Sequence, residues 1–306
     1  MTTQHRLNAG HRRTSRITGM QKRVVAGQIS SDTVAQALLK ATNSLAGESR
    51  RAEAELLLAR AIGQPRSWLY AHSDATLSDE QASTFLSFLG RRRCGEPVAM
   101  ILGVREFWSL ELTVTQDTLI PRPETELLVE LALEHMPAQT RARALDLGTG
   151  TGAIALALAH ERPLAEVTAI DADARTLSVA QNNAARLRLG HVRFLLGNWF
   201  SAVGEERYDV IVSNPPYIAD DDPHLLQGDL RFEPRSALVS GVDGLDALRV
   251  IARESPRHLQ PGGWLLLEHG FDQGTVVQGL LTSAGFTGVQ THLDIEGRDR
   301  VTSGRI

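Results

Sequence analysis

Apolar residues recur three or four positions apart through residues 31–96, which is the spacing of an amphipathic helix. The pattern is clearest within residues 49–62 and 78–93. Ser78, followed three residues later by Gln81, forms a capping-box pattern at the start of the last of these segments. The sequence therefore predicts a small helical domain over residues 31–96.

The spacing changes after this region. Trp108, Leu110, Leu112 and Val114 alternate with polar residues, as in one strand of a half-exposed hairpin. We interpret residues 97–120 as a β-hairpin linker between two domains.

Two closely spaced prolines, Pro121 and Pro123, bar a helix before Glu124, and the apolar pattern then allows one over residues 127–135. From there short apolar runs alternate with helical stretches. The expected strands are 143–147, 166–170, 192–196, 209–212 and 264–268, with a terminal hairpin over 289–293 and 300–303. The expected intervening helices are 153–160, 174–188 and 245–253. This alternation predicts an α/β domain over residues 121–306 with a doubly wound, mainly parallel sheet.

Composition supports a globular protein, because 42% of the 306 residues are hydrophobic. Cys94 is the only cysteine, so a disulfide framework and a structural zinc site are excluded and a reducing compartment is favoured. We expect no metal site. No apolar run approaches the roughly 18 to 20 residues that span a bilayer, and no hydrophobic secretory segment opens the chain. We expect a soluble, cytoplasmic protein.

Charge is distributed unevenly along the chain. Residues 1–30 hold six basic residues and no acid, and with a total net charge of -4 the remaining chain carries -10. The basic segment is interpreted as a disordered tail, with a transit peptide or a true start at Met20 as alternatives. An acidic body disfavours binding to a nucleic-acid backbone, which depends on Lys and Arg at the phosphates.

The apolar run of residues 208–212 ends in Ser213, Asn214, Pro215, Pro216 and Tyr217. Proline lacks the backbone N–H and keeps its carbonyl, so this exit from a buried strand presents mainly hydrogen-bond acceptors on a rigid, extended segment. Such a loop suits an NH2 group on a planar substrate. Without further information, a proline-stiffened strand exit explains the same residues.

A second motif follows the first expected strand of this domain. Gly148, Thr149, Gly150, Thr151 and Gly152, which we call the glycine loop, precede an expected helix. Glycines let a ligand approach the backbone, and the start of a helix offers free N–H groups.

The next strand ends at Asp171, 19 residues after Gly152, where a carboxylate can accept hydrogen bonds from both hydroxyls of a ribose. Dinucleotide-binding proteins share these features, so the glycines alone do not identify the cofactor. The loop of residues 214–217 distinguishes dinucleotide-binding enzymes from methyltransferases. Transfer of a methyl group to an NH2 nitrogen uses its hydrogen-bond acceptors, whereas hydride transfer does not. If the Asn214 oxygen and the Pro215 carbonyl accept the two hydrogens, the charge that develops on nitrogen is stabilised.

With these motifs the chain resembles class I S-adenosylmethionine-dependent methyltransferases that act on amino groups. Further segments narrow the resemblance to the peptide chain release factor glutamine methyltransferases, the PrmC or HemK family, from about Ser31 onward. These segments are residues 103–108, 120–126, 197–200, 222–224 and 228–234.

The resemblance implies a seven-stranded class I methyltransferase sheet with an N-terminal helical domain for substrate recognition. It implies methyl transfer from S-adenosylmethionine to the side-chain amide nitrogen of the glutamine in the Gly-Gly-Gln motif of class 1 release factors. By the same resemblance the glycine loop holds the methionine part of the cofactor, Asp171 holds the ribose, and Trp199 lies against the adenine. Asn214, Pro215, Pro216 and Tyr217 hold the glutamine amide, and Tyr217 either stacks on it or packs.

One position departs from the family pattern. Asn198 stands where the family often has an acid that accepts from the adenine amino group, and its side-chain oxygen can still accept. Elsewhere, we expect His269 and Trp108 to pack, and Arg231 and Glu233 to order a lid or pair with each other.

Three functions remain open on the sequence. The leading one is a glutamine methyltransferase that acts on a release factor as a monomer, with no direct contact to nucleic acid. The second is an adenine N6-methyltransferase on RNA or DNA, since a flipped adenine presents a similar amino group. The third, a cofactor-binding module with a decayed site, is disfavoured by the intact motifs.

Overall fold

The computed structural model describes residues 31–306, so the basic segment 1–30 lies outside the described residues. The chain divides into two compact units, with the boundary between Leu102 and Gly103. This boundary falls inside the range 97–120 that the sequence assigns to a linker. No helix within residues 31–306 combines the length and the apolar character that crossing a membrane requires.

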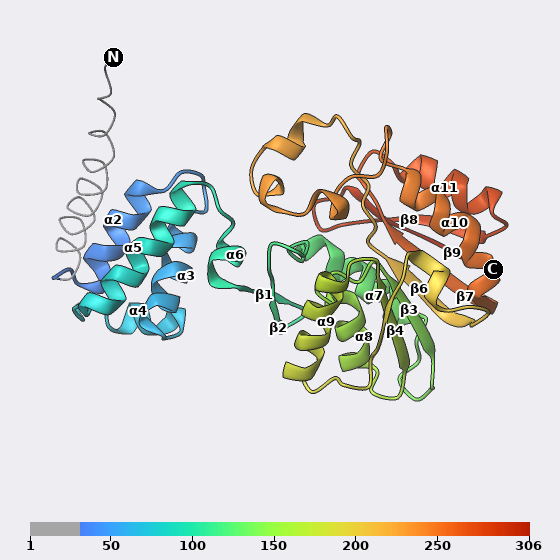
Figure 1. Cartoon of the computed structure of the whole chain (residues 1–306), viewed down its shortest axis with the longest axis horizontal. Helices are drawn as coiled ribbons and strands as arrows, with labels where there is room; N and C mark the ends of the chain where they lie inside the picture. The colour runs from blue at the N-terminus through green and yellow to red at the C-terminus, as the bar shows by residue number, and fades with distance from the viewer. Residues whose placement is uncertain (1–30) are drawn as a thin grey trace, which may run out of the picture. The chain divides into compact units, whose positions relative to one another are not determined.

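The first unit is helical (Figure 1). Its helices are α2 (Val34–Ser44), α3 (Arg50–Ile62), α4 (Arg66–Ala71), α5 (Asp79–Arg93) and α6 (Val98–Leu102). Thr33 and Ser78 cap α2 and α5 with reciprocal hydrogen bonds to Gln36 and Gln81, so the predicted capping box is present. The helices enclose a separate apolar core that is centred on Leu57, Leu58 and Phe85.

The second unit begins with a hairpin of β1 (Val104–Phe107) and β2 (Leu110–Thr113). Its two-residue turn places Trp108 at φ 52° and Ser109 at φ 58°, the geometry that matches the twist of a hairpin. Non-glycine residues adopt positive φ reluctantly, and here hydrogen bonds hold the turn. The Trp108 backbone N–H donates to Glu126, and its indole N–H donates to Glu161. Trp108 also packs against the apolar core of this unit, as predicted.

A seven-stranded sheet forms the centre of the second unit, with strand order β5-β4-β3-β6-β7-β9-β8. The strands are β3 (Arg143–Leu147), β4 (Glu166–Asp171), β5 (Arg193–Leu196), β6 (Tyr208–Ser213), β7 (Leu259–Glu268), β8 (Thr287–Leu293) and β9 (Asp299–Arg305). The pairs among β3 to β7 are parallel, whereas β9 runs antiparallel to β7 and β8. The predicted fold class is confirmed, with the terminal hairpin forming one edge of the sheet.

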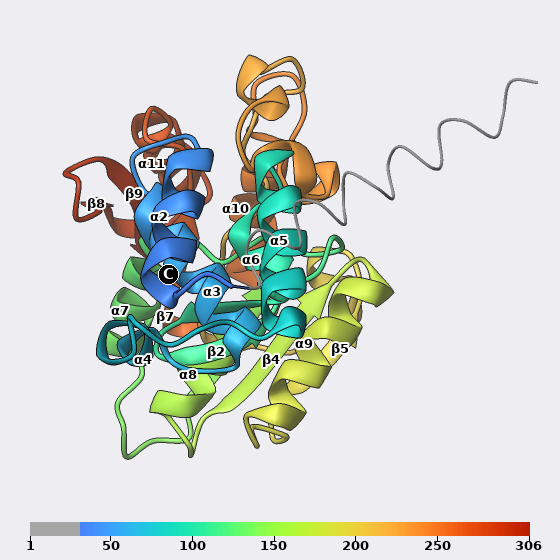
Figure 2. The same cartoon turned by 90° about the vertical axis from the view of Figure 1, so that its left-hand side faces the viewer.

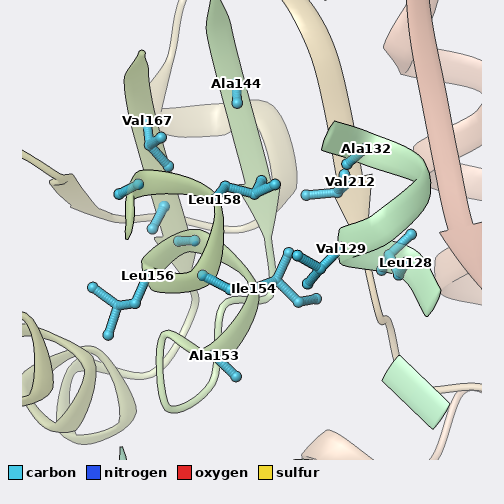
Figure 3. Packing of buried hydrophobic residues seen from close by; sticks show 14 of the residues in the cluster. Leu128, Val129, Ala132, Ala144, Ala153, Ile154, Leu156, Leu158, Val167 and Val212 are labelled. Atoms are coloured by element: carbon cyan, nitrogen blue, oxygen red, sulfur yellow. The ribbon is translucent and has the colours of Figure 1, made fainter. Parts of the chain in front are cut away.

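Helices cover both faces of the sheet. They are α7 (Glu126–Glu134), α8 (Ala153–Glu161), α9 (Ala174–Arg186), α10 (Asp246–His258) and α11 (Gly274–Ser283). Successive side chains of β3 point to opposite faces of the sheet, so the second unit has one apolar core on each face. Ala144 packs with α7 and α8 on one face, whereas Leu145 and Leu147 pack with α10 and α11 on the other. Figure 3 shows the first core, in which Ile154 and Leu158 of α8 lie near Val212 and the residues of α7. Helices α8 and α9 lie beside β4 in two perpendicular views (Figures 1 and 2).

Five short 3-10 helices lie in the described loops of the second unit. They are η1 (Pro123–Thr125), η2 (Trp199–Ala202), η3 (Pro223–Leu226), η4 (Leu230–Phe232) and η5 (Arg235–Ala237). Most predicted elements match within a few residues. Helix α11 has no counterpart among the expected helices, and α6 lies within the range 97–120 that was expected to form only a hairpin. Among the elements that were predicted, the largest differences are α10, which continues through Pro256 to His258, and β7, which starts five residues before the predicted Trp264. Leu259 pairs with Tyr208 across a bulge, so tertiary pairing extends β7 beyond its apolar run.

The order of the strands reverses between β3 and β6. The chain proceeds outward from β3 through β4 to β5, then returns to the other side of β3 for β6 and β7. Ligands of doubly wound sheets bind at the carboxyl ends of the strands beside this reversal. The glycine loop, Asp171 and Asn214 all follow or end strands at this edge.

Candidate active site

A cavity of about 580 Å³ lies at the carboxyl ends of the central strands. Among the predicted site residues, its lining includes Gly148, Thr149, Gly150, Thr151, Asp171, Trp199, Asn214 and Pro216. Gly152, Pro215 and Tyr217 are outside the lining, and Pro215 is buried. The fold thus gathers residues from four separate strand ends into one site.

The glycine loop turns sharply from β3 into α8. The Gly148 and Thr149 backbone N–H groups both donate to the Ile170 carbonyl at 2.9 Å, which fixes the loop to the end of β4. Gly150 has a φ of +59°, and a Cβ placed there would have no atom within 4 Å. A Cβ at Gly152 would lie 3.0 Å from Leu156 Cδ1 and 3.3 Å from the Ala180 Cβ. Gly150 therefore keeps space open at the cavity, whereas Gly152 permits close helix packing.

Asn183 of α9 holds the other side of this loop. Its side-chain oxygen accepts from the Thr113 backbone N–H at 2.8 Å, and its Nδ2 donates to the carbonyls of Thr113 and Thr151 at 3.1 and 2.9 Å. The side chain is fully buried. Asn183 thus connects the β1–β2 hairpin to the glycine loop through one amide group.

Asp146 supports the glycine loop from inside the sheet. Its Oδ2 accepts from the Thr149 hydroxyl at 2.6 Å and from the Ala155 backbone N–H at 3.2 Å. Burial raises the pKa of this carboxyl to about 7, against the hydrogen bonds that lower it. Asp146 was not predicted as a site residue from the sequence. An acid within the apolar run Ala144–Leu147, directly before the glycines, is the signal that could have identified it.

Asp171 ends β4 at the rim of the cavity. Its Oδ2 accepts from the Gly150 backbone N–H and its Oδ1 from that of Asp173, each at 3.0 Å. Burial raises the pKa of Asp171, and these backbone hydrogen bonds oppose the rise. Because each carboxylate oxygen can accept more than one hydrogen bond, Asp171 can also accept hydrogen bonds from the hydroxyl groups of a ribose.

Trp199 and Asn198 lie after β5. Trp199 adopts a φ of 48°, and its ring lies 3.6 Å from where a Cβ at Gly148 would be, so the indole borders the glycine loop. The Asn198 backbone N–H donates to Ser201 Oγ at 2.9 Å. Both residues line the cavity, where a planar base can lie against the indole.

Asn214 follows β6 and is oriented by Thr125. Its Nδ2 donates to Thr125 Oγ1 at 3.1 Å. Because the amide nitrogen is used in this contact, the oxygen of the same amide remains as an acceptor. Ser213 holds the strand end in place, since its hydroxyl donates to the Leu147 carbonyl at 2.6 Å.

Tyr217 leads away from the cavity toward a buried carboxyl at the end of β7. Its hydroxyl lies 3.5 Å from Oε1 of Glu268, and burial raises the pKa of Tyr217. Burial likewise raises the pKa of Glu268 to about 7, while the nearby Thr125 hydroxyl and the charge of Arg300 lower it. Neither Thr125 nor Glu268 was assigned a role from the sequence. The signal for Glu268 is an acid that closes the apolar run of β7.

Two further predictions concern residues near the site. Glu233 forms an ion pair with Arg122 at 2.7 Å, and Arg231 lies over the Phe232 ring. His269 is fully buried, with Nε2 2.8 Å from the Thr302 hydroxyl, which agrees with a packing role. Within residues 31–306, no cluster of His, Cys, Asp and Glu side chains could hold a metal ion.

These features fit S-adenosylmethionine. Open space beside Gly150 admits the cofactor close to the backbone, the start of α8 presents N–H groups, and Asp171 offers a carboxylate for the ribose. The indole of Trp199 provides a flat apolar surface for the adenine.

Comparisons with known proteins agree with this fit. Residues 125–229 match the family described as the methyltransferase small domain, and residues 36–103 match the PrmC N-terminal domain. The release factor glutamine methyltransferase of Xylella fastidiosa (strain Temecula1) is 54% identical, over 83% of this chain and 93% of that protein. The protein of the same name from Pseudomonas aeruginosa is 52% identical, over 88% of this chain and 97% of that protein.

A solved methyltransferase structure from Pyrococcus furiosus shares the fold, with a TM-score of 0.50 and 19% identity over 71% of this chain and 96% of that one. The protein is a methyltransferase, and its cofactor is S-adenosylmethionine. Identity above 50% across most of both chains shows that the chain belongs to the release factor glutamine methyltransferase family.

Proposed function

We propose that this enzyme transfers the methyl group of S-adenosylmethionine to the side-chain amide nitrogen, N5, of the glutamine in the Gly-Gly-Gln motif of class 1 release factors. The observation that carries this proposal is the orientation of Asn214. Its nitrogen is bound to Thr125, so its oxygen is the atom left to accept a hydrogen from a substrate. An acceptor at this position suits an NH2 group.

An amide nitrogen is a weak nucleophile because its lone pair is delocalised into the carbonyl group. S-Adenosylmethionine supplies an electrophilic methyl carbon bonded to a sulfonium sulfur. The Asn214 oxygen and the Pro215 carbonyl accept the two amide hydrogens, which stabilises the positive charge that develops on nitrogen and orients the lone pair. The N–C bond forms as the bond between the methyl carbon and sulfur breaks, which would leave S-adenosylhomocysteine as the neutral thioether. One of the two amide protons then passes to solvent, so no base is needed before attack.

The remaining roles belong to the same proposal, and the positions of the side chains support them. Gly148 to Gly152 hold the methionine part of the cofactor, Asp171 accepts from the ribose hydroxyls, and Trp199 lies against the adenine. Asn198 accepts from the adenine amino group. Pro216 and Tyr217 keep the Asn214 segment rigid, with Tyr217 packed rather than stacked on substrate, since burial raises its pKa and it lies outside the cavity lining.

We also propose that the helical unit, residues 31–102, contributes to recognition of the release factor. The enzyme acts as a monomer and needs no nucleic acid. Light scattering of the purified protein tests the monomer.

The function is tested by mass spectrometry. A purified, unmethylated class 1 release factor is incubated with the enzyme and S-adenosylmethionine, in parallel with total RNA. We expect one added methyl group on the Gly-Gly-Gln peptide and none on RNA. Methylation of RNA alone would overturn the protein substrate and support an adenine N6-methyltransferase instead.

A further inference from the structure

The two prolines after Asn214 limit the hydrogen bonds that can hold this segment in place. Pro215 and Pro216 have no backbone N–H to donate. In the proposed mechanism the Pro215 carbonyl accepts from the substrate amide, so it does not hold the segment either. The direction of that carbonyl therefore depends on how the two ends of the segment are held.

Strand β6 holds the first end. Ser213, its last residue, pairs with Leu147 of β3 and with Leu267 of β7. The Ser213 hydroxyl also donates to the Leu147 carbonyl at 2.6 Å. The segment thus starts from a fixed point inside the sheet.

Gln273 holds the other end, at the carbonyl of Tyr217. Its Nε2 donates to this carbonyl at 3.0 Å, and its Oε1 accepts from the Gly270 backbone N–H at 2.9 Å. A carbonyl only accepts and a backbone N–H only donates, so these two partners fix which end of the Gln273 amide faces Tyr217. Gln273 lies 56 positions after Tyr217 in the sequence and outside the cavity lining.

Backbone atoms pack closely around the same carbonyl. A Cβ at Gly244 would lie 2.3 Å from the Tyr217 oxygen and 3.1 Å from Gln273 Nε2. A side chain has no space there, and glycine also suits the φ of +75° at this position. Directly after Tyr217, the Ile218 backbone N–H donates to the Leu238 carbonyl at 2.9 Å. The second end of the segment is thus enclosed, and Gln273 supplies the side-chain donor that reaches its carbonyl.

We propose that Gln273 is a positioning residue that sets the direction of the Pro215 carbonyl at the substrate. The pyrrolidine rings fix φ at about −65° in both prolines, so an anchor at Tyr217 leaves the Pro215 carbonyl little freedom to turn. An acceptor that is already in place costs no reorganisation when charge develops on the substrate nitrogen. This inference rests on the proposed function, because it concerns one of the two acceptors in that reaction.

The first test is kinetic and uses Gln273→Glu. At about pH 8 the new side chain is ionised. It still accepts from the Gly270 N–H, but it places a second acceptor against the Tyr217 carbonyl. We expect kcat for release factor methylation to fall about 10-fold, the effect of one lost hydrogen bond. The Kd for S-adenosylmethionine should stay unchanged, because Gln273 is not part of the cavity lining.

Gln278→Glu is the matched control. Gln278 is also a half-buried glutamine, and its Nε2 donates to the Thr291 hydroxyl of β8 at 2.8 Å instead of to the substrate segment. This variant should leave kcat unchanged. A wild-type kcat in Gln273→Glu, or an equal fall in both variants, would overturn the role of Gln273.

The second test is structural and needs no protein substrate. Crystal structures of both variants are determined with S-adenosylmethionine bound. In Gln273→Glu we expect the Tyr217 carbonyl to turn away from the carboxylate and the Pro215 carbonyl to turn with it. In Gln278→Glu both carbonyls should keep their wild-type positions. An unmoved Pro215 carbonyl in Gln273→Glu would contradict the inference.

These outcomes are distinct from failure of the proposed function. If the wild-type enzyme does not methylate a release factor, the function itself is wrong, and the crystal structures alone decide whether Gln273 directs the Pro215 carbonyl. If the wild type is active and both variants match it, only the positioning inference fails. Melting temperatures of all variants, measured alongside, identify any loss of activity that comes from unfolding.

Discussion

Arg122 Nη2 lies 2.8 Å from Oε1 and 2.7 Å from Oε2 of Glu233, and this single nitrogen joins two segments that are 111 positions apart. The Glu233 side chain is fully buried, and burial raises its pKa against the attraction of Arg122. The Ile120 backbone N–H donates to the same carboxylate at 3.3 Å. Both segments supply lining of the cavity, so the ion pair holds one wall of the active site together.

Arg122→Met should therefore destabilise the protein strongly. It leaves a buried carboxylate without its partner, which costs about 3 kcal/mol, and thermal unfolding measures the loss. Arg186→Met is the control, since it removes an exposed Arg–Glu pair with Glu111, and exposed pairs contribute little. Equal melting temperatures for the two variants would contradict a structural role for Arg122. Adding Glu233→Gln to Arg122→Met should recover part of the loss, because no buried charge then remains.

Asn214→Ala tests the amide acceptor. We expect the rate of methyl transfer to fall by roughly 10² to 10³, as when one oriented polar group is removed from other active sites. The Kd for S-adenosylmethionine, measured by calorimetry, should change much less. Asn182→Ala removes an exposed amide from α9 and should behave as the wild type. Full turnover by Asn214→Ala would show that the substrate amide is held by other groups.

Gly150→Ala, compared with a control variant, tests whether lost space in the cavity or backbone strain weakens cofactor binding. The added methyl group would occupy the open region beside the glycine loop, and we expect the Kd for S-adenosylmethionine to rise about 10-fold. Gly204→Ala is closely matched, because its φ is +54° and its Cβ would also meet nothing within 4 Å. Both variants should lose about 1 to 2 kcal/mol of stability through the left-handed backbone. Only Gly150→Ala should lose cofactor affinity, and an equal loss in both would assign the effect to strain.

The raised pKa of Asp146 predicts that the stability of the protein depends on pH. Its folded-state pKa of about 7 lies above the ordinary 3.8, so between these values the unfolded chain has already lost the proton that the folded protein keeps. Stability from this group is therefore greatest at low pH and declines as the pH rises toward 7, by up to about 4 kcal/mol. Relative to Asp146→Asn, the wild-type melting temperature should fall from pH 5 to pH 7 and then level off. Asp272→Asn, at an exposed position, controls for the loss of one carboxylate.

The sequence predicted the parts of the fold that depend on local patterns. The strand Arg143–Leu147 was predicted with its exact bounds, because an apolar run between polar residues marks a buried strand. The extension of β7 to Leu259 was missed, since it depends on pairing with Tyr208 and carries no apolar pattern of its own.

The active site was predictable where function requires unusual local residues. The glycine loop and the two prolines after Asn214 are conspicuous in the sequence because ordinary strands and helices avoid them. Thr125 was not predictable as the partner of Asn214, because η1 and the end of β6 come together only in the folded chain. Glu233 was expected to order a lid or pair with Arg231. The observed partner of Glu233 is Arg122, which lies too far away in the sequence for residue spacing to indicate the pair.

The amide of Asn183 has a thermodynamic consequence. Because it contacts both Thr113 of the hairpin and Thr151 of the glycine loop, a ligand that orders the loop also restrains the hairpin. Coupling between two binding events is reciprocal. If cofactor binding stabilises the ordered hairpin by a given free energy, then ordering the hairpin strengthens cofactor binding by the same free energy. Gly103, the first residue after the helical unit, directly precedes this hairpin. A partner that restrains the hairpin would therefore tighten cofactor binding without touching the cavity.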